Sequence, residues 1–132
     1  MANGEKVPPA DLELAISTEP LFEQAMIVGE GKPFLSALVV LNRTNWEKLA
    51  GALSVPADKE SSLDIPEVQH ELMKRIKEKL APFPGYARIF RVEATLEPWT
   101  VEAGLITPTL KLKRNCLIEK YEDVIIGMYE GH

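Results

Sequence analysis

Three cations within four residues, Lys111, Lys113 and Arg114, are the side chains of this sequence best suited to chemistry. They end a connection, residues 99–114, that is too long for a simple link, and long connections are often functional. A lysine ammonium is a compact charge that can neutralise a phosphate or a developing oxyanion. In an extended chain Lys111 and Lys113 point the same way. A loop of this kind is able to carry a cation to an anionic ligand such as a phosphate.

The alternative interpretation is that these cations are ordinary solvated charges at the start of the last helix, since most surface lysines are inert. One physical argument opposes it. Cations at a helix N-terminus interact unfavourably with the helix dipole, by up to about 1 kcal/mol each, so another interaction should favour them there. Spacing alone leaves both interpretations open.

The first part of the chain predicts a helix and a β-hairpin that would hold this loop. The helix should open at Pro8-Pro9 and stop near Pro20. Residues 24–28 and 34–41, joined by the glycine-containing turn 29–32, should then pair as a hairpin. The second strand is apolar on both faces, which predicts a place in the middle of a sheet.

Two more helices should follow the hairpin. Thr44 and Glu47 form a capping-box pattern at the start of one helix, and Asp64 is placed to cap the next. The apolar stripe of that second helix runs from Ile65 to Leu80.

A third strand and a last helix complete the prediction. Residues 88–95 alternate as in a half-buried strand, with Phe90 on its apolar side. From Arg114 the pattern predicts one helix that faces a core with Leu117, Ile118, Tyr121, Val124, Ile125 and Met128. The expected fold class is α+β: a small antiparallel sheet of three strands flanked by helices.

Composition excludes several function classes. A length of 132 residues suits a single domain, and a net charge of −5 disfavours nucleic-acid binding. One cysteine, Cys116, and two distant histidines, His70 and His132, offer no zinc site and no internal disulfide. No stretch resembles a signal peptide or a transmembrane helix, so we expect a cytoplasmic protein. Peripheral contact with a membrane stays open.

Three segments, in order along the chain, resemble motifs of the long-chain acyl-CoA synthetases, members of the adenylate-forming superfamily. They are spread along most of the chain, from residue 3 to residue 114. They are residues 3–13 (NGEKVPPADLE), residues 25–34 (AMIVGEGKPF) running into 37–40 (ALVV), and residues 97–114 (EPWTVEAGLITPTLKLKR).

This resemblance implies two half-reactions and a site for each. A fatty-acid carboxylate first attacks the α-phosphate of ATP, and coenzyme A then displaces AMP after the domain rotates. By its place in the motif Lys111 is the adenylation lysine, with Lys113 the runner-up and Thr109 beside them. After the rotation the domain is oriented for thioester formation. In that orientation the resemblance places Gly4, with Lys6 close by, beside the path of the pantetheine arm of coenzyme A.

Two positions depart from the superfamily pattern. Many members have glycine directly before the lysine, where this chain has Leu110, a residue common in the long-chain branch. The family often has asparagine where this chain has Ala103. The first departure supports the subfamily but leaves the choice between Lys111 and Lys113 less settled.

No phosphate-binding loop and no acidic pair suited to magnesium stand out in the sequence. The family's hinge residue would lie before Asn3, where only Met1 and Ala2 remain. We therefore expect residues 1–132 to form a single C-terminal domain, separated from a large N-terminal domain that would bind fatty acid, ATP, Mg2+ and coenzyme A. The fragment itself should bind none of them tightly. The alternative is a stand-alone module that binds a nucleotide or coenzyme A, or only another protein, without catalysis.

Overall fold

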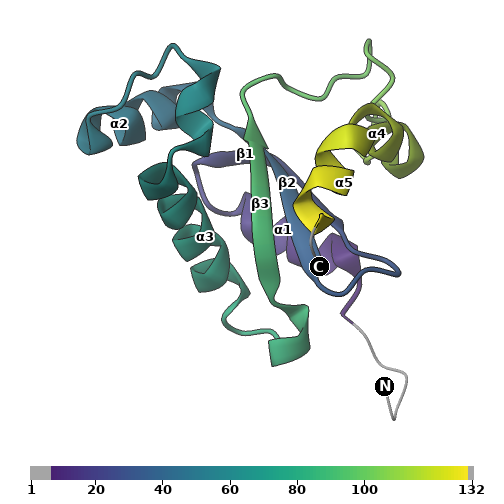
Figure 1. Ribbon diagram of the computed structural model, residues 1–132. Coiled ribbons are helices and arrows are strands. Elements are labelled where there is room, and N and C mark those ends of the chain that lie inside the picture. The colour runs from purple at the N-terminus through teal and green to yellow at the C-terminus, as the bar shows by residue number, and fades with distance from the viewer. Residues whose placement is uncertain (1–6, 131–132) are drawn as a thin grey trace.

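The computed structural model describes residues 7–130, which form one three-stranded sheet with helices on both faces (Figure 1). The element order follows the sequence prediction. The elements are α1 (Pro9–Ser17), β1 (Phe22–Val28), β2 (Leu35–Leu41), α2 (Arg43–Leu53), the 3-10 turn η1 (Glu60–Asp64), α3 (Pro66–Leu80), the 3-10 turn η2 (Gly85–Ala87), β3 (Ile89–Thr95), α4 (Arg114–Lys120) and α5 (Glu122–Tyr129).

The sheet is mixed, which corrects the antiparallel prediction. Its strand order is β1-β2-β3, so the apolar strand is central as expected. The hairpin partners β1 and β2 are antiparallel, but β2 and β3 are parallel. Residues 42–88 cross one face of the sheet through α2 and α3 before β3 begins, and a crossover of that length lets two neighbouring strands run parallel.

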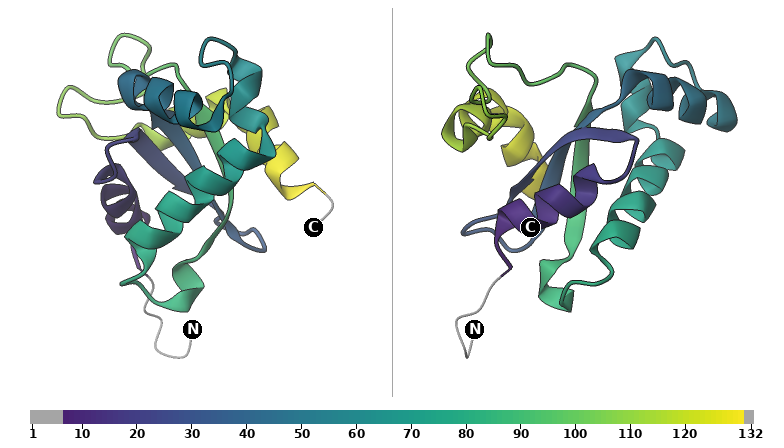
Figure 2. Two further views of the ribbon diagram at one scale, coloured as in Figure 1. Left: turned by 90° about the vertical axis from the view of Figure 1, so that its left-hand side faces the viewer. Right: turned by 180° about the vertical axis from the view of Figure 1, so that it is seen from behind.

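Alternate residues of β2 enter two different cores. Ala37, Val39 and Leu41 pack with the side chains of α1, α2 and α3, whereas Leu38 and Val40 pack with Trp99 and the last two helices. Figure 2 shows the resulting layers, with α1–α3 on one face of the sheet and α4–α5 on the other. Burial on both faces explains why β2 reads as a continuous apolar run.

Two helix starts differ from the prediction. The side chain of Asn42, rather than Thr44, caps α2 by accepting the Asn45 N–H at 2.9 Å. Asp64 ends η1, and α3 begins with Pro66 without a side-chain cap. The N–H at the first position of a helix has no partner within the helix. Proline has no N–H, so it suits that position.

The prediction for β3 was wrong at Phe90. The pairing shifts from Leu35–Ile89 to Ser36–Arg91, so Phe90 is an extra residue in the strand, and its side chain is 54% exposed. A bulge of this kind reverses which side a residue faces.

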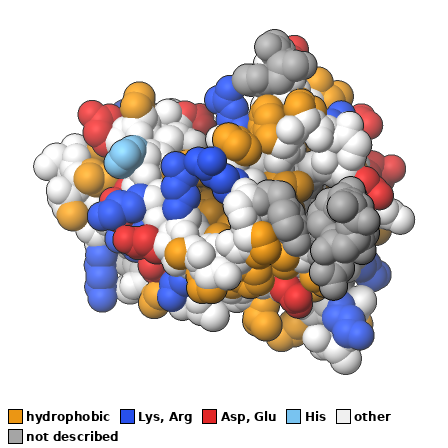
Figure 3. Space-filling view, turned by 90° about the horizontal axis from the view of Figure 1, so that it is seen from below, with side chains coloured by type: hydrophobic (Ala, Val, Ile, Leu, Met, Phe, Trp, Pro, Cys, Tyr) orange, Lys and Arg blue, Asp and Glu red, His pale blue; other side chains and the backbone are white. Residues whose placement is uncertain are grey.

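The predicted last helix is divided into α4 and α5 at Tyr121, and Ile118 lies on the exposed side. The Tyr129 hydroxyl donates to the Phe34 carbonyl oxygen at 2.7 Å and the two rings lie 4.6 Å apart, which fastens α5 to the hairpin. Hydrophobic side chains are also exposed near the middle of the face seen from below the view of Figure 1 (Figure 3).

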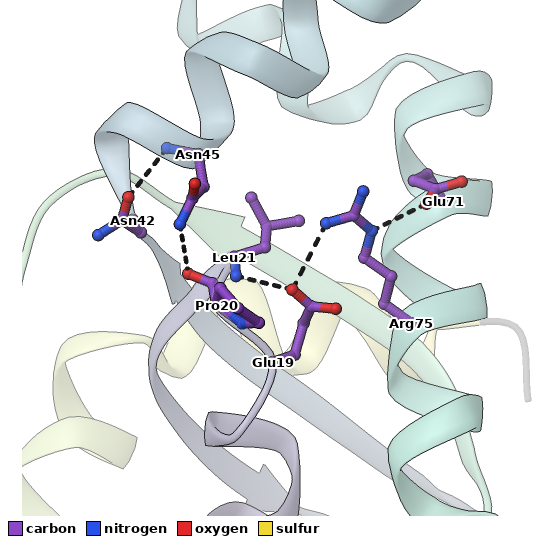
Figure 4. A network of polar contacts seen from close by, with 7 residues as sticks. All are labelled: Glu19, Pro20, Leu21, Asn42, Asn45, Glu71 and Arg75. Carbon is purple, nitrogen blue, oxygen red and sulfur yellow. Dashed lines mark hydrogen bonds and ion pairs between the residues drawn. The ribbon is translucent and has the colours of Figure 1, made fainter.

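A polar network connects elements on the face of the sheet that α1–α3 cover (Figure 4). The Arg75 Nε lies 2.8 Å from a Glu71 carboxylate oxygen, and its Nη1 lies 3.5 Å from Glu19. Glu19 also accepts the Leu21 N–H at 2.9 Å. These contacts join α3 to the turn that leads into β1. None of the helices within residues 7–130 is long and apolar enough to cross a membrane.

Candidate functional site

The connection from β3 to α4 forms an ordered hairpin of its own over residues 105–113, separate from the β1–β2 hairpin. Gly104 turns the chain with a φ of +76°, a conformation that glycine adopts without steric cost. Ile106 and Leu112 then form an antiparallel bridge, and the Lys113 N–H donates to the Leu105 carbonyl oxygen at 2.9 Å. The residues between them, 107–111, form the tip.

Threonine hydroxyls stabilise this tip. The Thr107 backbone N–H donates to the Lys111 carbonyl oxygen at 2.8 Å, and the Thr107 Oγ1 accepts the Lys111 N–H at 3.0 Å. The Thr109 Oγ1 lies 3.0 Å from the same Thr107 hydroxyl. Thr109, a predicted binding residue, therefore already has a partner in the turn, and Lys111 is held by its backbone from two sides.

Leu110 adopts the conformation that glycine would prefer. Its φ is +68°, and its side chain is 74% exposed. A left-handed backbone costs a residue with a Cβ roughly 1–2 kcal/mol. The chain thus keeps a glycine-like backbone directly before Lys111 although the glycine of many superfamily members is replaced.

Lys111 and Lys113 are both exposed. Among residues 7–130, no carboxylate lies within ion-pair distance of either ammonium. The two lysines differ in position, because Lys111 belongs to the tip whereas Lys113 belongs to the base of the hairpin. The structure therefore offers one unpaired positive charge at the end of a fixed arm and a second nearer the body of the domain.

Arg114, the third cation, is half-buried and paired. Its Nη1 and Nη2 lie 2.7 and 3.0 Å from the two carboxylate oxygens of Glu13, a residue of α1 that is 8% exposed. Glu13 also accepts the Ile27 N–H at 2.7 Å. Hydrogen bonding to Glu13 raises the pKa of Arg114, which secures its positive charge. This contact is the favourable interaction that we expected to offset the helix dipole at the start of α4.

The start of the connection is fastened by residues that the sequence interpretation missed. The Gln24 side-chain amide donates to the Trp99 carbonyl oxygen at 2.9 Å and accepts the Trp99 N–H at 2.8 Å. The Trp99 indole donates to the Tyr121 hydroxyl at 2.9 Å. Gln24, the polar residue of the otherwise apolar predicted strand 24–28, was the one available signal. Both ends of the connection are therefore bound to β1 or its neighbours.

Two hollows adjoin these elements, and glutamates line both of them. A groove of about 540 Å³ runs between α1 and the hairpin, where Leu14 and Leu110 are its exposed apolar sides. A smaller hollow of about 310 Å³ is lined by Glu60, Glu93 and Glu97 and by one cation, Lys120. Burial raises the pKa of Glu93, and the nearby charges of Asp64 and Glu60 act in the same direction. An acidic hollow repels phosphates, so the cationic hairpin is the better candidate for an anionic ligand.

The two remaining predicted site residues, Gly4 and Lys6, lie outside the described residues. Among residues 7–130, no group of three or more histidine, cysteine, aspartate or glutamate side chains is arranged to hold a metal ion.

Comparison with known proteins decides the family. The model of the AMP-binding enzyme C-terminal domain matches residues 1–132. The chain belongs to this family. The resemblance to the long-chain synthetases is confirmed as well. Over 97% of this chain, the long-chain-fatty-acid–CoA ligase FadD15 of Mycobacterium tuberculosis is 32% identical. The ligase ACSBG1 of Rattus norvegicus is 30% identical over 98% of it.

The chain covers 22% of FadD15 and 20% of ACSBG1, so it spans about a fifth of the length of these relatives. Solved structures agree on the fold of this AMP-binding C-terminal domain. The adenylation domain of the carboxylate reductase of Mycobacterium chelonae matches with a TM-score of 0.72 and 26% identity, over 98% of this chain and 19% of that one. An A-PCP didomain of carboxylic acid reductase from Segniliparus rugosus, in complex with AMP, matches with a TM-score of 0.75 and 22% identity, over 98% and 17%.

The left-handed backbone at Leu110 predicts an unusual response to glycine. Leu110→Gly should raise the free energy of unfolding by up to about 1 kcal/mol, because the steric cost disappears and little buried surface is lost. Lys111→Gly, at a neighbouring position without a positive φ, should lower it by about 0.5–1 kcal/mol. Urea unfolding of the two variants measures both effects. A loss of stability in Leu110→Gly equal to that in Lys111→Gly would contradict the strained geometry.

Proposed function

We propose that this chain is the mobile C-terminal domain of an AMP-forming long-chain fatty-acid–CoA ligase, and that Lys111 is its adenylation lysine. The observation that carries the proposal is the unpaired ammonium of Lys111 at the tip of a hairpin fastened at both ends. The long-chain-fatty-acid–CoA ligases among the relatives support the substrate class. The remaining four-fifths of such a protein would form the large domain that binds ATP and the fatty acid.

The chemistry of the first half-reaction calls for a cation of this kind. When a carboxylate oxygen attacks the α-phosphate, pyrophosphate leaves and negative charge accumulates around the phosphorus. A positive charge already held in position stabilises that transition state without reorganisation. Lys111 would contact the phosphate and the acyl oxygen. Mg2+ would arrive with ATP in the large domain, where it would neutralise phosphate charge.

Position within the hairpin favours Lys111 over Lys113. Lys111 directly follows the turn residue Leu110, so its side chain starts from the tip of the hairpin. The backbone of Lys113 is bonded to Leu105 at the base, and the next residue is held by Glu13. Lys113 would therefore supply a weaker, more distant positive field.

The second half-reaction would use the N-terminal segment of the chain. After rotation, Gly4 would face the path of the pantetheine arm and Lys6 would lie close to it. A glycine lets backbone approach a ligand closely because it has no side chain. The thiol of coenzyme A would then attack the acyl carbon, and AMP would leave as the thioester forms.

Substitution of the two lysines tests their assignment. In the full-length ligase, Lys111→Ala should slow formation of acyl-AMP by about 10² to 10³, because one positioned charge is lost from the transition state. Thioester formation from supplied acyl-AMP should be affected far less. Lys113→Ala should slow adenylation much less than Lys111→Ala. Single-turnover measurement of pyrophosphate release compares the two, and a larger effect of Lys113→Ala would overturn the assignment of Lys111.

A bulky side chain at Gly4 tests the two-pose scheme. Gly4→Leu in the full-length ligase should leave pyrophosphate release near normal, while acyl-AMP accumulates and acyl-CoA falls sharply. If Gly4 serves only a turn with positive φ, leucine should instead impair folding or both half-reactions alike. Quench-flow analysis of both products from one reaction separates the outcomes, and Gly4→Ala provides a milder variant if leucine prevents folding.

A further inference from the structure

The last residues of two distant sequence motifs meet in one contact. Glu13 ends the first motif, Arg114 ends the third, and the two are 101 positions apart in sequence. Their side chains pair through two hydrogen bonds, of 2.7 and 3.0 Å. Neither residue is among the groups for which the proposed function supplies a role.

Three elements converge on this pair. Glu13 belongs to α1, Arg114 is the first residue of α4, and the Ile27 N–H of β1 donates to the same Glu13 oxygen that Arg114 Nη1 contacts. Arg114 Nη1 also lies 3.4 Å from the Ile27 carbonyl oxygen. The contact therefore links a helix on one face of the sheet to a helix on the other, at the edge of β1 (Figure 1).

The pair also fixes the position of the base of the 105–113 hairpin. Arg114 directly follows Lys113, whose N–H closes the base of the hairpin on Leu105, and it lies three residues from Lys111. Movement of Arg114 would therefore move the base and the tip together. The fork of a guanidinium matches a carboxylate in a defined plane, which an ammonium cannot do.

The pair is only partly buried, since the Arg114 side chain is 39% exposed. Desolvation of Glu13 and solvent screening at Arg114 offset much of the attraction, so the pair contributes little net stability, but its geometry is specific. We propose that Glu13 and Arg114 are positioning residues for Lys111, which hold the hairpin at the angle that brings the ammonium to the reacting phosphate. This inference rests on the proposed function. We expect substitution of either residue to slow adenylation more than it destabilises the fold.

The test uses Arg114→Lys and Glu13→Gln in the full-length ligase, which keep size and much of the polarity but lose the matched fork or the charge. Each should lower the single-turnover rate of adenylation by about tenfold or more at saturating ATP, since small misplacements of a reacting group are costly. Arg75→Lys is the matched control: Arg75 also pairs with a carboxylate at 2.8 Å, in the network of Figure 4, away from the hairpin. It should leave the rate unchanged.

A double-mutant cycle distinguishes positioning from general stability. In a Lys111→Ala background, Arg114→Lys should have no further effect on adenylation, because the group that it positions is gone. Hydrogen exchange followed by mass spectrometry should show faster exchange in residues 105–113 of Arg114→Lys, with β2 unchanged. Independent, additive rate losses, an equal loss in Arg75→Lys, or unchanged exchange in the hairpin would each overturn the inference.

The failure of the proposed function has a different signature. If Lys111→Ala itself left adenylation unchanged, Lys111 would not be the adenylation lysine, whatever the exchange data showed. Faster exchange confined to residues 105–113 would then still establish that the pair holds the hairpin, while its positioning role in adenylation would be refuted.

Discussion

A carboxylate on α1 and a guanidinium at the start of α4 meet at the edge of β1, and the arrangement of the candidate site depends on that contact. Glu13 is almost fully buried and uses both oxygens, one of them also for the Ile27 N–H. Removing Arg114 would leave the Glu13 carboxylate unpaired in a poorly solvated place, whereas the Arg114 side chain, 39% exposed, keeps access to water without Glu13. The two layers on either side of the sheet are thereby held in one orientation at the point where the hairpin ends.

The hairpin itself is built so that its own polar groups are bonded to each other, which leaves its lysine side chains available. The Gln24 side chain bonds the backbone N–H and C=O of Trp99, as a neighbouring strand would. Thr107 bonds the backbone N–H and C=O of Lys111. The strained Leu110 lies between these bonded groups, so the surrounding contacts offset its cost. A fixed arm of this kind costs little entropy when it meets a ligand. Under the proposed function the domain brings a charge, and another part of the protein would supply the enclosed phosphate site.

Much of the fold could be predicted because burial follows side-chain type at most positions. Residues 34–41 are apolar on both faces, and that pattern was enough to place β2 in the centre. The direction of β3 could not be predicted, because it depends on how residues 42–88 cross the sheet. The bulge at Phe90 and the break at Tyr121 are single-residue events that periodicity does not register. In the site, Lys111 and Lys113 were found from charge and loop length. Glu13 and Gln24 were not, since a partner 101 or 75 positions away leaves no local pattern.

The central claim is that this domain carries a catalytic charge but depends on a second domain for its substrates. ATP–pyrophosphate exchange with the purified 132-residue chain, in the presence of Mg2+ and a long-chain fatty acid, tests it most directly. We expect no exchange above the level without protein, and isothermal titration should show no ATP binding tighter than roughly millimolar, about −4 kcal/mol. Robust exchange by the chain alone would contradict the account, because it would require a complete nucleotide site within these residues.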